Sequence, residues 1–128
     1  MRLTICLTTA LVLSTGSTPL AAKPAHFQLM STTWTYVDPD QKVKVRESID
    51  AKGNYIENAV SGKHVDHGTA VMKGKKVCFT SAMTKEGELC WTTPKSELKV
   101  GQSFVATSDK GRKLKVTRVA YVKLEMPK

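Results

Sequence analysis

The sequence predicts an all-β protein, in which about eight antiparallel strands form an up-and-down barrel. An open β-sandwich is the alternative arrangement. Short runs in which apolar and polar residues alternate follow one another along the chain, and this two-residue period is typical of strands. Residue types that tolerate tight turns separate these runs. No segment sustains a helical period. Strands joined mainly by hairpins form a meander, and closing the meander into a barrel removes its exposed edges.

The alternation places each expected strand in turn. In the second strand, Val43, Val45 and Ile49 alternate with lysine and arginine, and in the last strand Leu114 and Val116 alternate with lysine. The turn signals between runs are Asp38-Pro39-Asp40, Lys52-Gly53-Asn54, Ser61-Gly62-Lys63, Gly74, Gly87 and Asp109-Lys110-Gly111. The expected strands therefore span residues 30–37, 41–50, 54–60, 64–73, 75–81, 88–92, 103–108 and 113–124, and only 93–102 forms a longer connection.

The N-terminus has the three parts of a secretory signal peptide. Arg2 supplies the positive charge, residues 3–13 are mainly apolar, and small residues end at Ala22. The apolar stretch is shorter than a membrane-spanning helix requires. We therefore expect residues 1–22 to be removed, leaving residues 23–128 as one soluble domain, which does not span a membrane and is periplasmic or secreted.

The chain is strongly basic, with 20 lysine and arginine residues against 11 acidic residues and a net charge of +9. The positive charge is spread along the chain, without the long basic run or interleaved aromatic residues of a nucleic-acid groove, so we expect no nucleic-acid partner. Solvated strand faces explain this charge most simply. Attraction to an acidic envelope component or partner protein is the functional alternative.

Two cysteines, Cys78 and Cys90, remain once the signal peptide and its Cys6 are removed, and they are free to pair in an oxidising compartment. If Cys78 faces Cys90 across a hairpin, four apolar side chains share the opposite face: Val77, Phe79, Leu89 and Trp91. A catalytic dithiol more often has Cys-x-x-Cys spacing. The spacing therefore predicts a structural disulfide.

Trp34 lies in the first expected strand, and Arg118 lies in the last strand with the parity of its apolar residues. This combination resembles the calycins, the group that includes lipocalins, fatty-acid-binding proteins and avidins. The resemblance implies a barrel in which the Arg118 guanidinium lies over the Trp34 indole in a structural cation–π contact. Thr32 stands where lipocalins usually have glycine. The chain is also similar to short uncharacterised secreted proteins of Gram-negative bacteria, which implies no activity.

Two further polar residues fall on the apolar faces of their strands: Glu47 shares the face of Val43, Val45 and Ile49, and His67 shares that of Val65, Thr69 and Val71. With Arg118 they would form a polar trio inside the barrel, where a carboxylate needs a cation or donor. Alternatively, a bulge or a barrel end turns them into solvent. The other candidates for lining a ligand site are Tyr55, Phe79, Trp91 and Phe104.

We expect no metal, no cofactor and no enzymatic activity. His64 and His67 are three residues apart on one expected strand, so their side chains should point to opposite faces and not chelate one ion. No nucleophile motif, phosphate loop or diagnostic carboxylate pair is present. The alternative is a small enzyme in which Glu47 and His67 act together as a general base.

The sequence therefore favours an exported binding protein, which holds a small apolar or amphipathic ligand in a β-barrel. The alternative is an envelope-associated protein-binding module or inhibitor that uses its loops, its basic surface and the segment 23–28.

Overall fold

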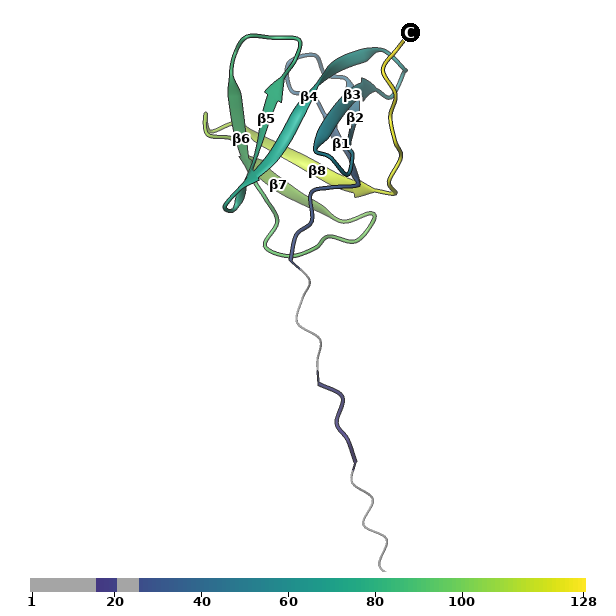
Figure 1. Cartoon of the computed structure of the whole chain (residues 1–128), viewed down its shortest axis with the longest axis vertical. Helices are drawn as coiled ribbons and strands as arrows, with labels where there is room; N and C mark the ends of the chain where they lie inside the picture. The colour runs from purple at the N-terminus through teal and green to yellow at the C-terminus, as the bar shows by residue number, and fades with distance from the viewer. Residues whose placement is uncertain (1–15, 21–25) are drawn as a thin grey trace, which may run out of the picture.

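The structure is a computed structural model that describes residues 16–20 and 26–128. The expected signal peptide and its cut after Ala22 lie almost entirely outside the described residues. The structure is all-β: eight strands form one antiparallel sheet that curves into a nearly closed barrel (Figure 1). Within the described ranges, no helix is long and apolar enough to cross a membrane.

The strands follow the predicted alternation closely. Their bounds are β1 (Thr32–Val37), β2 (Lys44–Ile49), β3 (Asn54–Ala59), β4 (His64–Lys73), β5 (Lys76–Ser81), β6 (Glu88–Thr92), β7 (Ser103–Thr107) and β8 (Lys113–Val119). The second strand begins later than predicted because Lys42 has a φ of 56° and closes a turn, in which its amide donates to the Asp38 carbonyl over 2.9 Å. The last strand ends earlier because Val122 instead donates its amide to the Thr33 hydroxyl over 2.9 Å.

The sheet order is β6-β5-β4-β3-β2-β1-β8-β7, so β1 pairs with both β2 and β8. The two outer strands, β6 and β7, meet through a single bridge between Trp91 and Ser108. Two hydrogen bonds reinforce it: the Thr107 amide donates to the Thr92 hydroxyl over 2.9 Å, and the Asp109 amide donates to the Cys90 carbonyl over 3.0 Å. These contacts close the meander and confirm the barrel over the open sandwich.

Buried side chains from most of the barrel form one core inside it. The cluster consists of Leu29, Trp34, Ile49, Tyr55, Ala70 and Val77. Leu29 belongs to the segment before β1, and its carbonyl accepts a hydrogen bond of 2.5 Å from Thr32. The Thr32 hydroxyl in turn accepts one of 2.9 Å from the Trp34 indole. The lead-in segment therefore covers the end of the barrel where β1 begins.

The predicted hairpin register is confirmed. Cys78 lies opposite Cys90, with a Cα–Cα distance of 4.0 Å, and the two sulfur atoms are bonded. Val77 lies opposite Trp91 and Phe79 opposite Leu89. Because directly paired residues share a face of the sheet, the apolar pairs face the interior while the disulfide lies on the outside of the barrel.

Candidate functional site: a cavity inside the barrel

A cavity of about 310 Å³ lies in the barrel interior and receives side chains from all eight strands. This volume would hold roughly ten water molecules at about 30 Å³ each. It lies at the lower end of the volume range of ligand pockets. The exposed turn residues Thr84, Glu86 and Lys110 also border it. The cavity therefore reaches the surface at the end of the barrel where the β5–β6 and β7–β8 turns lie.

One side of the cavity is apolar and largely aromatic, and we call it the aromatic wall. Its residues come from β1 and from β5 to β8: Trp34, Val77, Phe79, Leu89, Trp91, Phe104 and Val116. The rings of Trp34 and Phe104 pack edge to face with centroids 6.2 Å apart, and those of Tyr55 and Phe79 do so at 5.2 Å. These contacts fix the shape of the wall.

The opposite side carries three carboxyl groups, the acidic row, formed by Glu47, Glu57 and Asp66. Glu47 on β2 lies directly opposite Glu57 on β3, which lies directly opposite Asp66 on β4. All three therefore face the same side of the sheet, and all three line the cavity. The row crosses three neighbouring strands of the barrel wall.

Neutral hydroxyl groups donate hydrogen bonds to the acidic row. The Tyr55 hydroxyl donates to Asp66 over 2.8 Å and the Ser81 hydroxyl does so over 2.6 Å. Tyr36 also lines the cavity, and burial raises the pKa of its hydroxyl, which the charges of Glu57 and Glu47 raise further. Among the described residues, no lysine, arginine or histidine forms an ion pair with any of the three carboxyl groups. The protein therefore stabilises this row without a positive charge.

Burial and mutual repulsion alter the acidity of the row. Burial raises the pKa of Glu47 well above its ordinary value, and the neighbouring Glu57 and Asp66 raise it further. Burial also raises the pKa of Glu57, although hydrogen bonds from Glu47 and Tyr36 act in the opposite direction. Burial therefore makes both glutamates harder to ionise than an exposed glutamate.

Five of the six residues expected to line a ligand site border the cavity: Glu47, Tyr55, Phe79, Trp91 and Phe104. The sixth, His67, is not among the lining residues. It pairs with Ile56 on the outer face of β4, whose inner face carries Asp66 and Gly68. The expectation that His67 shares the interior with Glu47 and Arg118 is therefore corrected.

His67 faces outward because it shares the face of Thr69 and Val71, whereas Ala70 and Met72 face the interior opposite Phe79 and Val77. A β-bulge between β3 and β4 places His64 on the same outer face. His64 pairs with Asn58 while Asp66 pairs with Glu57, so the strand gains one residue at Val65. The bulge brings His64 Nε2 to 3.1 Å from His67 Nδ1, and His64 Nδ1 to 2.8 Å from the Asn58 side-chain oxygen. The expectation that these two histidines face opposite sides is therefore wrong. The pair lies on the outer face, away from the cavity.

Sequence reasoning missed several polar residues that line the cavity, among them Tyr36, Glu57, Asp66 and Ser81. Glu57 had a usable signal, because it lies two residues from both Tyr55 and Ala59 and therefore shares their buried face of the strand. Asp66 had none, because its face of β4 carries the small residues Gly68 and Ala70, whereas the opposite face carries Val65 and Val71.

Arg118 lies opposite Trp34 in the pairing of β8 with β1, and its Cζ atom is 5.9 Å from the centroid of the indole. The guanidinium forms an ion pair with Glu97 and donates to the Leu98 carbonyl over 3.0 Å. Both partners lie in the connection between β6 and β7. Arg118 is thus neutralised at the end of the barrel far from the mouth and does not reach the acidic row.

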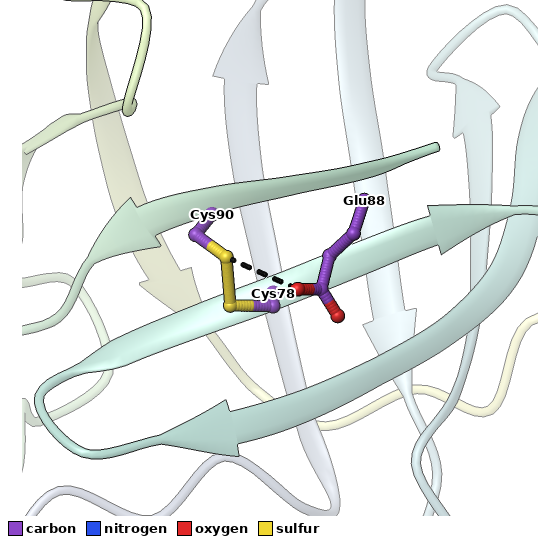
Figure 2. Close-up of side chains that lie close together, drawn as sticks. All are labelled: Cys78, Glu88 and Cys90. Carbon is purple, nitrogen blue, oxygen red and sulfur yellow. Dashed lines mark hydrogen bonds between the residues drawn. A yellow bond between two sulfur atoms is a disulfide. The ribbon is translucent and has the colours of Figure 1, made fainter. Parts of the chain in front are cut away.

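The disulfide lies beside a third possible metal ligand. Cys78, Cys90 and Glu88 bring their ligand atoms within 4.8 Å of one another, and Glu88 Oε1 is 3.7 Å from Cys90 Sγ (Figure 2). The two sulfur atoms are bonded to each other, so neither offers the thiolate that metals bind. Glu88 instead pairs with Lys73 over 2.8 Å.

Comparison of the chain with protein-family models, with curated proteins and with solved structures finds no match. The resemblance to calycins therefore depends on Trp34, Arg118 and the strand order alone.

Proposed function

We propose that this protein is an exported binding protein that holds a small amphipathic molecule in its barrel. The observation that carries the proposal is the cavity, in which an aromatic wall faces a row of polar groups. A concave apolar site with a few convergent polar groups is the usual form of a small-molecule site. The disulfide is compatible with an oxidising compartment outside the cytoplasm.

The identity of the inward-facing residues explains why the interior is not filled. Side chains fill the interior of many eight-stranded barrels. In this barrel, two inward positions that border the cavity carry small residues, Ser81 on β5 and Ala106 on β7. The space that larger side chains would occupy remains open, and it connects to the surface at the mouth.

Tryptophan fluorescence tests the proposal directly. The sequence contains two tryptophans, Trp34 and Trp91, and both line the cavity. The neutral apolar fluorophore N-phenyl-1-naphthylamine should therefore quench tryptophan emission saturably by energy transfer, at one molecule per chain. Quenching that rises linearly without saturation would overturn the proposal.

A matched pair of variants shows whether the probe binds inside. Ala106 is buried and lines the cavity, whereas its neighbour Val105 is 56% exposed. Ala106→Leu adds volume to the cavity and should weaken probe binding by about tenfold or more, since overpacking costs roughly 1–3 kcal/mol. Val105→Leu adds volume to the outside of the same strand and should leave binding unchanged. Equal effects of the two variants would place the probe outside the barrel.

A further inference from the structure

We propose that the ligand is a cation, namely an amphipathic amine whose ammonium group binds the acidic row while its apolar part lies against the aromatic wall. The inference rests on the proposed function, because it names the class of molecule that the same cavity takes. The carboxyl groups that carry it are those of Glu47, Glu57 and Asp66.

The first argument is the arrangement of the acidic row. Like charges directly opposite one another on neighbouring strands destabilise a sheet, and this row contains two such contacts in succession. Glu47 is only 8% exposed, and in the part of the chain that the structure describes no lysine, arginine or histidine forms an ion pair with its carboxyl group. A buried carboxyl group that faces a cavity without a protein cation is the complement of a positively charged ligand.

The second argument is the distribution of charge over the molecule. Basic residues outnumber acidic residues by 20 to 11, yet three of those 11 acidic residues lie together in the cavity. Among the described residues that line the cavity, Lys110 is the only cation. It is exposed at the rim and forms no ion pair with the row. The cavity therefore has the opposite charge to the protein around it.

The third argument distinguishes an amine from a metal ion. In the described ranges, the only group of three ligand-type residues with atoms within 4.8 Å of one another is Cys78, Glu88 and Cys90. The acidic row is therefore too widely spaced to hold one metal ion by all three groups. An ammonium group binds carboxylates through hydrogen bonds of about 2.8 Å, which are longer than metal–oxygen bonds, so it spans a wider set of oxygens. The aromatic wall requires that the rest of the molecule is apolar.

The experiment compares three eight-carbon molecules that differ in their polar group: octylamine, 1-octanol and octanoate. Each is titrated against the protein loaded with N-phenyl-1-naphthylamine, and its affinity is read from displacement of that probe. Octylamine should bind at least about tenfold more tightly than octanol, as expected for charge-assisted hydrogen bonds in a buried site. Octanoate should bind most weakly, because its carboxylate meets the acidic row.

Variants assign the effect to the row. The double substitution Glu47→Gln with Glu57→Gln keeps the side-chain volume and removes both carboxyl groups, so it should weaken octylamine binding by about tenfold or more and leave octanol binding within about twofold. Octanol binding also shows that the variant is folded. Glu125→Gln, which changes an exposed residue outside the cavity, should change neither affinity.

The outcomes separate the two proposals. Octanol or octanoate binding as tightly as octylamine, or octylamine binding unaffected by the double substitution, would overturn the inference about the cation and leave the binding function standing. A protein that binds neither the probe nor any of the three molecules would overturn the proposed function itself.

Discussion

The disulfide between Cys78 and Cys90 should stabilise both the domain and its binding cavity. It closes a loop with a sequence separation of 12, for which the loss of chain entropy in the unfolded state corresponds to about 3 kcal/mol. The bridge also fixes β6, which otherwise has the β5 ladder on one side and a single bridge to β7 on the other. Because Trp91 on β6 lines the cavity, the bridge affects binding as well as stability.

The test replaces both cysteines by alanine and measures unfolding in urea. With a slope of about 1–3 kcal/mol per molar urea, a loss of about 3 kcal/mol lowers the midpoint by roughly 1–3 M. Thermal unfolding should occur about 12–24 °C lower, at 4–8 °C for each kcal/mol. The variant should also bind N-phenyl-1-naphthylamine more weakly under native conditions, because β6 opens more often.

The control is a cross-strand pair without a covalent bond. Ser103 and Thr117 share a hydrogen bond of 2.6 Å between their hydroxyl groups on β7 and β8. Replacing both by alanine should cost no more than about 1 kcal/mol. A disulfide variant that loses less than about 1 kcal/mol, or no more than this control, would refute the reasoning from loop closure.

Three further substitutions test single contacts. Glu47→Gln should stabilise the protein at pH 7 by at least about 1 kcal/mol. The raised pKa of Glu47 destabilises the folded state once the pH exceeds the unfolded pKa of about 4.3, so the gain measured by urea unfolding should disappear below about pH 4. Gly68→Ala should lower the free energy of unfolding by about 1–3 kcal/mol, since a Cβ atom there would lie 2.0 Å from the Thr80 carbonyl oxygen; an unchanged melting temperature would contradict this. Arg118→Met should lower the free energy of unfolding by about 1–3 kcal/mol, because it removes a half-buried ion pair and the cation–π contact. The control, Arg112→Met, removes an exposed ion pair and should lower it by less than about 1 kcal/mol. Equal losses in the two variants would argue against the structural role of Arg118.

Much of the fold was predictable because its signals are local. Gly74 and Gly87 flank β5 and β6, and both adopt positive φ values of 61° and 82°, as turn residues do. The predicted bounds of β4 and β6 agree with the structure at both ends. The register of β5 against β6 followed from one assumption, the pairing of Cys78 with Cys90.

The lining of the cavity was predictable only where one face of a strand is clearly the more apolar. Tyr55, Phe79 and Trp91 line the cavity as expected. On β4 the apolar residues Val65 and Val71 share the face of His67, but the pairing of Ala70 with Phe79 turns the opposite face, which carries Asp66, toward the interior. Because the side-chain period of a strand is two residues, choosing the wrong face misplaces every residue of the strand.

The sequence by itself determined the strands, the turns and the disulfide, since each depends on residues close together in the chain. Only the tertiary structure decided that β1 pairs with β8, which brings Arg118 over Trp34, and that three neighbouring strands align Glu47, Glu57 and Asp66 in one row. Both results depend on how distant strands align, and that alignment is set by packing around a common interior. The cavity exists for the same reason, because its volume is what remains after inward-facing side chains from all eight strands have been placed.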